Sequence, residues 1–507
     1  MILITTALEE TFPQNSNEEV LFLGEWCKIF SKKDSWSKFN SKTLDYHWDD
    51  RKKLYSDYKY LTGIYEKYLF VLSEQLNLIH GEGHSLKYWR IIIGLWLRRF
   101  IDIVFDRYAT INKAINSHNI DKVYALNVDS SDAVPIDMHD FNQLSISDEW
   151  NHFIYSFLIK KTKCNTININ NSLMIKHAVL SKNTIKKISM QFNRLNNISF
   201  HASYIGRSAL LKLQLSLKQF PALDYINRIF IDDTYDENIR SNIDFRSDNL
   251  DDFESTLTEL IRLQIPKSYL ESYKELKEVS LKRYSSKPKA ILTAVGQSSF
   301  DDFKIWSATR VENKAKLIFA QHGGHYGTSL FSSHEEHEIK ISDRYFSWGW
   351  GGDNRKIIPM PANKLVGKVN SNPNGDILII IMNIPRYHYA TYAIPISSQY
   401  LIYVDQLINF ISSLKKEVKE HIKIRTHRQD YDWCVRDRIH DSGLREIVDD
   451  DTNLVKSLKD RLQDCRLYIA TYNATTFLET FVLEFPTLIF FNSDYWELNS
   501  NAKKYFD

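Results

Sequence analysis

Two histidines flank a pair of glycines in the segment AQHGGHYGTS, residues 320–329. His322 and His325 stand on either side of Gly323 and Gly324, directly after the apolar run KLIFA. Glycines let a backbone approach a ligand closely. A histidine here could act as an acid, a base or a hydrogen-bond donor to phosphate. The segment has neither the GxGxxG spacing of a dinucleotide-binding loop nor the GK[ST] ending of a P-loop.

A metal site is an alternative interpretation of the same region. It would use His322 and His325 together with the downstream residues His334, Glu335, Glu336 and His337. Zinc takes such ligands, and a metal-dependent hydrolase would follow from them. However, no HExxH is present, and no aspartate stands at a metal-like spacing. A third interpretation is that these histidines only serve the structure.

A second segment whose residues could bind a ligand is TYNATTFLE, residues 471–479. Asn473, Thr475 and Thr476 follow an apolar strand and open a predicted helix. Free N–H groups and small hydroxyls at a helix N-terminus suit an anion such as phosphate. Glu479, one turn further on, could accept a hydrogen bond from a ribose hydroxyl. The alternative is plain N-capping by Asn473 or Thr475.

Two further strand-end segments carry polar side chains, RTHRQD (425–430) and GQSSFDD (296–302). Arg425 and His427 could donate hydrogen bonds to a phosphate or carboxylate. The alternative for RTHRQD is a solvated basic turn.

The N-terminal half contributes weaker candidates. Glu9 and Glu10 end the first predicted strand, where a general base could sit. His84 precedes a helix in HGEGHSLKYWR (80–90). The alternatives are a surface carboxylate pair and a capped helix start.

Strands and helices alternate along most of the chain. Apolar runs predict strands, and three- and four-residue apolar spacing predicts helices. Strands are expected at 2–6, 123–127, 290–295, 316–321, 376–384, 421–427, 466–472 and 487–491. Helices are expected at 56–80, 86–108, 253–283, 299–312, 398–419, 451–464 and 474–484, and in much of 151–220. Residues 231–252 read as a polar loop, and 334–350 as a helix and a strand.

This alternation predicts an α/β protein with two Rossmann-like halves and helical additions in the N-terminal half. Five glycines and three prolines in residues 349–376 indicate a linker, placed at 351–375 between 1–350 and 376–507. Ligands of such sheets bind outside the carboxyl ends of the strands, which is where the segments above lie.

Composition excludes several classes of protein. With 65 basic and 63 acidic residues, nucleic acid is not expected as the main ligand. The four scattered cysteines indicate reduced thiols in a cytosolic protein. The N-terminus lacks a signal-peptide pattern. IIIGLWL (91–97) is too short to span a bilayer, although the Trp- and Arg-rich face of helix 86–108 leaves peripheral membrane contact open beside a core role.

Several long motifs resemble a known family: TTALEETF, LGEWC, HWDDR, HSLKYWRIIIG, QHGGHYGT, EEHEIKISDRYFSWGW and TYNATTFLETF. Over most of its length the chain resembles the LIC12162-type transferase family of bacterial O-antigen and surface-polysaccharide gene clusters. More distantly, the C-terminal half resembles GT-B glycosyltransferases that use CMP-activated acidic sugars, such as capsular Kdo and sialic-type transferases. Arg425-Thr426-His427 would match their R/K-x-H-P element, although Arg428 stands in place of the proline.

The resemblance implies a GT-B-like fold with two domains facing a cleft, the first for the acceptor and the second for the donor. It implies a cytoplasmic enzyme, at the inner face of the plasma membrane if membrane contact occurs. The enzyme would need no cofactor or catalytic metal and would transfer a nonulosonic or Kdo-like sugar from CMP to a glycan or lipid-linked acceptor. Donor contacts would come from Gln321, Gly323, Gly324, Arg425, His427, Asn473, Thr475, Thr476 and Glu479.

The same resemblance places His322 at the reacting centre, with Glu9, Glu10 or His84 facing the acceptor. QHGG also resembles the WHGT loop of teichoic-acid polymerases of the CDP-glycerol type, which again points to His322. A polyol-phosphate transferase is therefore an alternative. A glycan-binding protein without catalytic activity is another.

Overall fold

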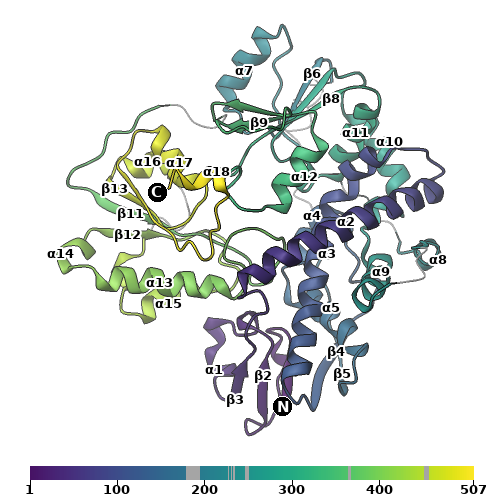
Figure 1. Cartoon of the computed structure of the whole chain (residues 1–507), viewed down its shortest axis with the longest axis vertical. Coiled ribbons are helices and arrows are strands. Elements are labelled where there is room, and N and C mark those ends of the chain that lie inside the picture. The colour runs from purple at the N-terminus through teal and green to yellow at the C-terminus, as the bar shows by residue number, and fades with distance from the viewer. Residues whose placement is uncertain are drawn as a thin grey trace.

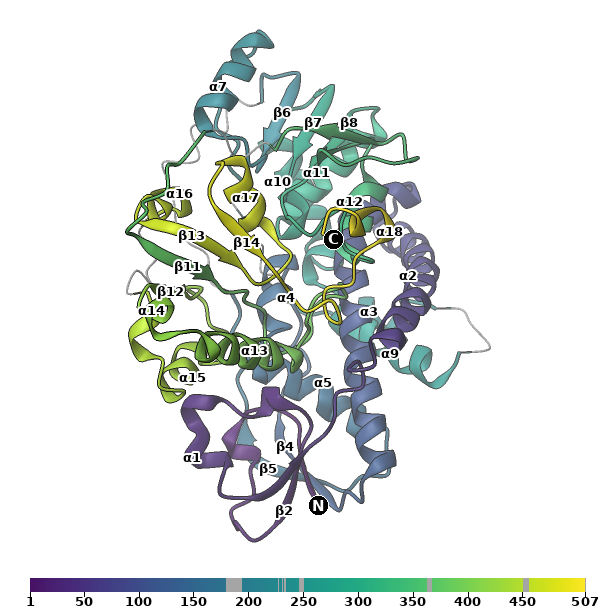
Figure 2. The same cartoon turned by 60° about the vertical axis from the view of Figure 1, so that its left-hand side comes forward.

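The computed structural model describes residues 1–178, 194–226, 228–229, 231, 234–245, 250–362, 367–449 and 456–506, without the side chain of Glu446. The strands of these residues form three separate parallel sheets, which lie at the bottom, top and left of Figures 1 and 2. Helices surround and connect them. The protein therefore has an α/β architecture consistent with Rossmann-like folding.

The first sheet is built from the N-terminal residues. Its strands are β1 (Ile2–Ile4), β2 (Glu19–Phe22), β3 (Asn40–Thr43), β4 (Lys122–Asn127) and β5 (Thr166–Ser172). They lie in the order β3-β2-β1-β4-β5, and every neighbouring pair is parallel. Val20, Leu21 and Phe22 of the inner strand β2 are fully buried, as expected for a parallel sheet covered on both faces.

The second sheet has the order β10-β9-β8-β7-β6. Its strands are β6 (Ile198–His201), β7 (Ala290–Thr293), β8 (Lys316–Ala320), β9 (Arg344–Trp348) and β10 (Ile357–Met360). The connecting helices include α10 (Tyr273–Arg283), α11 (Asp301–Glu312) and α12 (Ser333–Ile341). β8, which carries the His-Gly-Gly-His loop at its carboxyl end, is the central strand.

The third sheet, in the C-terminal residues, has the order β12-β11-β13-β14. Its strands are β11 (Asp376–Ile380), β12 (Ile422–Arg425), β13 (Cys465–Ala470) and β14 (Thr487–Ile489). Around it lie α13 (Gln399–Ser413), α14 (Lys416–Lys419), α15 (Val435–Asp441), α16 (Leu458–Leu462), α17 (Thr475–Val482) and α18 (Ser500–Lys503). α17 begins directly after β13, so its N-terminus lies at the carboxyl edge of this sheet.

Two long helices run through the middle of the molecule, α2 (Arg51–His80) and α3 (Leu86–Ser117). α2 begins at the N-cap Asp50, whose side chain accepts from two backbone N–H groups, and ends at Gly81 in the left-handed conformation. α3 packs against α2 and against helices of the first and second sheets. Trp89 and Trp96 are fully buried, and Arg98 pairs with Asp102 inside the protein. The Trp- and Arg-rich face is therefore core, and its interpretation as a membrane surface was wrong.

The remaining described helices are shorter. They are α1 (Lys33–Trp36), α4 (Met138–Leu144), α5 (Asp148–Lys160), α7 (Arg207–Ser216), α8 (Glu237–Ser241) and α9 (Asp252–Gln264), with 3-10 turns such as Glu9–Thr11 and Glu25–Cys27. No helix of the described residues is long and apolar enough to cross a membrane. All four cysteines are free thiols.

The sequence pattern predicted two Rossmann-like halves, whereas the N-terminal 350 residues hold one complete sheet and most of another. β10 lies inside the segment interpreted as a linker, 351–375, of which 363–366 are outside the described residues. The start of the helix predicted at 451–464 and part of the region 151–220 also fall outside them. The predicted strands and helices of the C-terminal residues are otherwise confirmed, with ends shifted by a few residues.

Candidate functional site

The loop after β8 is held in place by Gln321. Its side-chain oxygen accepts hydrogen bonds from the backbone N–H of Trp348, at 2.8 Å, and from the indole N–H of Trp350, at 2.7 Å. Its amide nitrogen donates to the carbonyl of Gly323 at 2.7 Å. Gln321 is almost fully buried. This side chain, predicted to contact a donor, is thus occupied in fixing the loop to the end of β9.

His322 is largely buried, beside polar side chains. Its side chain is 19% exposed, and Nδ1 stands 3.6 Å from a carboxylate oxygen of Glu338. On the other side of the ring, Nε2 is 3.5 Å from the hydroxyl of Tyr326. The ring of Tyr204, from the segment after β6, lies 6.2 Å away. Burial lowers the pKa of His322 to about 4, so its imidazole is neutral at pH 7.

Beneath the loop, helix α12 supplies two carboxyl groups, the half-buried Glu335 and the buried Glu338. Glu335 accepts from the backbone N–H of Gly327 at 3.1 Å. Burial raises the pKa of Glu335 to about 7. Glu338 has no exposed surface, and burial, reinforced by the charge of Glu335, raises its pKa well above the usual range. Burial therefore favours the protonated form of the carboxyl group behind His322.

The other histidines of this region are also interior. His334 accepts from the guanidinium of Arg99 at 3.1 Å, and burial lowers its pKa well below the usual range. Burial lowers the pKa of both His325 and His337 to about 3. Across the described residues, no group of three or more His, Cys, Asp or Glu side chains is arranged to hold a metal ion. The metal interpretation gains no support from this arrangement.

The loop after β8 contacts the start of α17, joining the carboxyl edges of the second and third sheets. The backbone N–H of Gly324 donates to the hydroxyl of Thr475 at 3.1 Å, and the Asn473 amide donates to the hydroxyl of Thr328 at 3.1 Å. A Cβ on Gly324 would lie 2.2 Å from the carbonyl oxygen of Ala474. Only glycine permits this approach of two backbones.

The contact also settles how α17 begins. Its N-cap is Ala474, and no side chain caps the helix. Asn473 and Thr475 use their polar groups on the loop after β8 instead, so the alternative interpretation, in which one of them caps the helix, was wrong. The Thr476 hydroxyl accepts from Tyr468 at 2.7 Å and donates to Tyr472 at 3.2 Å.

The other predicted donor residues lie along the third sheet. Arg425 is buried and donates to the carbonyl of Lys456. His427 is exposed, and its Nδ1 accepts from the backbone N–H of Gln429 at 3.2 Å. Glu479 is buried on the first turns of α17. A small hollow of about 60 Å³ opens beside Thr471, lined largely by aromatic rings, including Tyr403, Phe490, Phe491, Tyr495 and Trp496.

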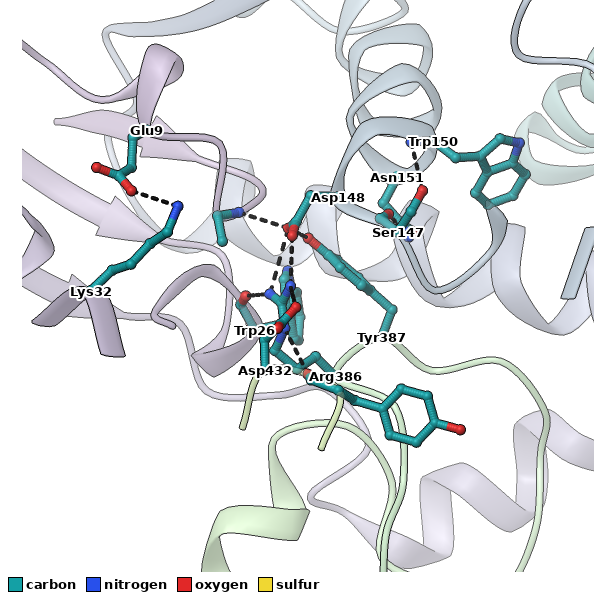
Figure 3. A network of polar contacts seen from close by, with 12 residues as sticks. Glu9, Trp26, Lys32, Ser147, Asp148, Trp150, Asn151, Arg386, Tyr387 and Asp432 are labelled. Atoms are coloured by element: carbon teal, nitrogen blue, oxygen red, sulfur yellow. Dashed lines mark hydrogen bonds and ion pairs between the residues drawn. The ribbon is translucent and has the colours of Figure 1, made fainter. Parts of the chain in front are cut away.

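Glu9, Glu10 and His84 lie in other surroundings than the loop after β8. Glu9 and Glu10 are exposed after β1, where Glu9 pairs with Lys32 at 2.7 Å, as Figure 3 shows. His84 stacks on Tyr88, and its Nδ1 lies 2.6 Å from Glu312, at the end of α11. No contact given by the structure joins any of the three to His322.

Beside Glu9, a network joins the first sheet to the C-terminal residues (Figure 3). Asp148, the first residue of α5, accepts from the backbone N–H of Ala7 at 2.9 Å, from Arg386 at 2.6 Å and from the hydroxyl of Tyr387. Arg386 also donates to the carbonyl of Trp26. The segment after β11 is thereby fastened to the strand ends of the first sheet.

Glu338 and Tyr204 are neighbours of His322 that sequence reasoning missed. The i, i+4 spacing of His334 and Glu338 in HEEHE was a usable signal, because both then share a face of α12. Tyr204 offered none, since β6 is short and each of its residues pairs with a residue of β7 that lies 92 positions further along the chain.

A family model described as LIC12162 family transferase matches the chain from residue 1 to residue 507. No curated protein and no solved structure matches it. The family description indicates a transferase.

Proposed function

The chain belongs to the LIC12162 family of transferases, and on that basis we propose that it is a glycosyltransferase of bacterial O-antigen or capsule synthesis. It would move a nonulosonic or Kdo-like sugar from a CMP donor to a glycan or lipid-linked acceptor in a GT-B-like arrangement. One observation carries the proposal: the loop after β8 packs directly on the start of α17. Two parallel sheets thus meet at the edges where α/β proteins bind ligands.

The donor phosphate would lie near the start of α17 and the end of β12. The first N–H groups of α17 have no side-chain cap, and they carry the positive end of the helix dipole. Arg425 and His427 would add donors, Gly323 and Gly324 would allow close approach, and Glu479 would hold the ribose. Aromatic rings stack well on nucleobases, and the hollow beside Thr471 supplies them on the same sheet edge.

His322 would act at the reacting centre. In the proposed reaction, an acceptor hydroxyl attacks the anomeric carbon, and the bond from that carbon to the donor phosphate oxygen breaks. The leaving phosphate takes the electron pair, and the hydroxyl proton passes to a base. A neutral imidazole can take that proton or donate a hydrogen bond to the phosphate. Burial keeps His322 neutral, and Tyr326 and Glu338 flank its two nitrogens.

A nucleotide screen by thermal shift tests the donor. CMP should raise the melting temperature in the presence of EDTA, because a ligand that binds only the folded state stabilises it by about 2.7 kcal/mol at a hundredfold over its Kd. A shift with CDP alone would favour the polyol-phosphate alternative. A shift with UDP or GDP alone would contradict the CMP donor, and no shift with any nucleotide would contradict the donor site.

Substitution separates His322 from the histidines outside the site. His322→Ala should abolish sugar transfer and leave the CMP shift largely intact, whereas His427→Ala should weaken both. His118→Ala, at the far end of α3 beside Ser117, is the matched control. Full transfer activity in the His322 variant would refute its assignment.

A further inference from the structure

Helix α7 carries apolar side chains that the rest of the protein leaves uncovered. Only Leu210 and Gln214 of this helix are buried. Leu215 is 55% exposed, and Phe220, just after the helix, is 59% exposed. They belong to an exposed apolar set that we call the α7 surface: Leu211, Leu213, Leu215, Leu217, Phe220 and Leu223. Single exposed leucines are ordinary, but six within 13 residues mark an interaction surface.

The charged side chains in the sequence around this surface are basic. Residues 194–223 contain no aspartate or glutamate, and they include Arg194, Arg207, Lys212 and Lys218. Arg207, Lys212 and Lys218 stand exposed among the leucines. Asp224, the first carboxylate after this stretch, is engaged by the backbone N–H and the hydroxyl of Ser203.

A hollow accompanies the helix. It has a volume of about 450 Å³ and lies between α7 and the extended segment 221–225. Leu210, Leu211, Leu223 and Tyr225 line it, and Arg207 stands at its edge. A hydrocarbon chain fits such a lining, with an anionic headgroup beside the guanidinium.

The α7 surface stands at one end of the long axis of the molecule, projecting beyond the second sheet in both views (Figures 1 and 2). No other labelled element lies above it in these views. A flat partner can therefore approach α7 without meeting the first or third sheet.

We infer that the α7 surface docks on an anionic lipid bilayer, with its leucines in the interface and its basic side chains at the headgroups. Amphipathic helices with basic and apolar side chains bind anionic membranes in this way. A second copy of this chain is disfavoured as the occupant, because two surfaces with the same excess of positive charge repel each other. The inference stands independently of the proposed sugar transfer.

Docking in this orientation would bring the candidate site near the membrane. α7 begins three residues after Tyr204, whose ring lies 6.2 Å from that of His322. Under the proposed function, a lipid-linked acceptor held in the bilayer would meet His322 from this side. The docking experiment itself measures no transfer, so its failure leaves the donor test unaffected.

Vesicle co-sedimentation of the full chain tests the inference. Vesicles of phosphatidylcholine with an equal part of phosphatidylglycerol should bind the protein, and binding should weaken at high salt or without phosphatidylglycerol. The combined variant Leu211→Gln, Leu215→Gln and Phe220→Gln should bind at least about tenfold more weakly, since withdrawing even one leucine from an apolar environment costs about that much. Lys212→Glu with Lys218→Glu should weaken binding by about fivefold or more for each charge.

The matched control is Phe70→Gln with Leu78→Gln on α2, where the two side chains are 52% and 72% exposed. Its vesicle binding should equal that of the unchanged protein. All replaced residues are exposed, so melting temperatures should stay unchanged and report that each variant folds. Equal binding by the α7 variant and the control would overturn the inference. So would the absence of vesicle binding, or a dimer that the α7 variant dissociates without any vesicle binding.

Discussion

Gly324→Ala should separate the loop after β8 from the start of α17. The added Cβ would stand 2.2 Å from the carbonyl oxygen of Ala474, 2.3 Å from its carbon and 2.6 Å from the nitrogen of Thr475. Ordinary contact begins at 3.4 Å, so moving from 2.2 to 3.4 Å requires a shift of about 1.2 Å. All three atoms are backbone, so no side chain can rotate away. Overpacking of this kind costs about 1–3 kcal/mol.

The consequence for activity is larger than the consequence for folding. A misplacement of about 1 Å among catalytic groups can reduce a rate about a hundredfold. We therefore expect Gly324→Ala to remain folded, to lose the proposed transfer and to show a weaker CMP thermal shift. Hydrogen exchange should rise in peptides covering 321–328 and 471–478.

The control for this substitution is Gly352→Ala, which meets no atom within 4 Å and lies in an exposed part of the same sheet edge. It should leave stability, exchange and nucleotide binding unchanged. If Gly324→Ala matches this control in all three measurements, the two segments are not packed as described, and the reasoning fails.

Three further substitutions test other parts of the structure. Gln321→Ala leaves two tryptophan N–H donors without their acceptor. It should lower the free energy of unfolding, measured in urea, by about 1–3 kcal/mol. An unchanged free energy would show that these hydrogen bonds do not hold the loop. Asp148→Asn breaks a largely buried pair with Arg386 and should cost about 3–5 kcal/mol. The control Glu484→Gln, at an exposed pair with Lys368, should leave the free energy of unfolding nearly unchanged, because water screens exposed pairs. Equal losses would contradict the difference in burial. The pKa of Glu335 is raised from 4.5 to about 7, so its contribution to stability is complete below pH 4.5 and is lost as the pH rises through 7. The stability of Glu335→Gln relative to the unchanged protein should therefore rise between pH 5 and pH 8. If urea titrations give the same difference in the free energy of unfolding at every pH, the pKa shift of Glu335 is refuted.

The inner strands β11 and β13 of the third sheet could be predicted from apolar runs. Parallel strands covered on both faces need such runs, and DILIIIMNI and RLYIATY supply them. TLIFF also predicted a strand, although β14 is an edge strand whose Leu488 is 53% exposed. β11 ends early, at Ile380, because Met382 turns its backbone N–H toward the hydroxyl of Tyr403. Apolar content predicted burial correctly there, but it could not place the end of pairing.

Most strands of the first sheet were not predicted from the sequence. β3 (NSKT) and β5 (TININNS) are its two edge strands, and most of their side chains are exposed or half-buried. Edge strands need no apolar run, since one side of them has no neighbouring strand. β1 and β4 were predicted, whereas the buried apolar run of β2 (Glu19–Phe22) was missed, so a five-stranded sheet was taken for isolated strands.

The contacts between the segments of the candidate site could not be predicted from the sequence either. The residues of QHGG and TYNATT were recognised separately, yet Gly324 and Thr475 are 151 residues apart, and only the folded chain brings them together. Residue type likewise could not show that the Gln321 amide makes three hydrogen bonds to its own loop and to the neighbouring strand end.

Several polar atoms of this region lack a hydrogen-bond partner. Gln297, His337 and Asn473 are buried and His325 is half-buried, and each has at least one buried side-chain nitrogen or oxygen without a hydrogen-bond partner among the described residues. Leaving such an atom unsatisfied costs about 1–3 kcal/mol, and apolar side chains of similar size would avoid that cost. These residues come from the ends of β7, β8 and β13 and from α12, and comparable unsatisfied atoms occur elsewhere in the described core, at Tyr58, Trp96 and His152 for example. Under the proposed function, a bound donor would supply hydrogen-bond partners to those that lie beside His322 and the uncapped start of α17.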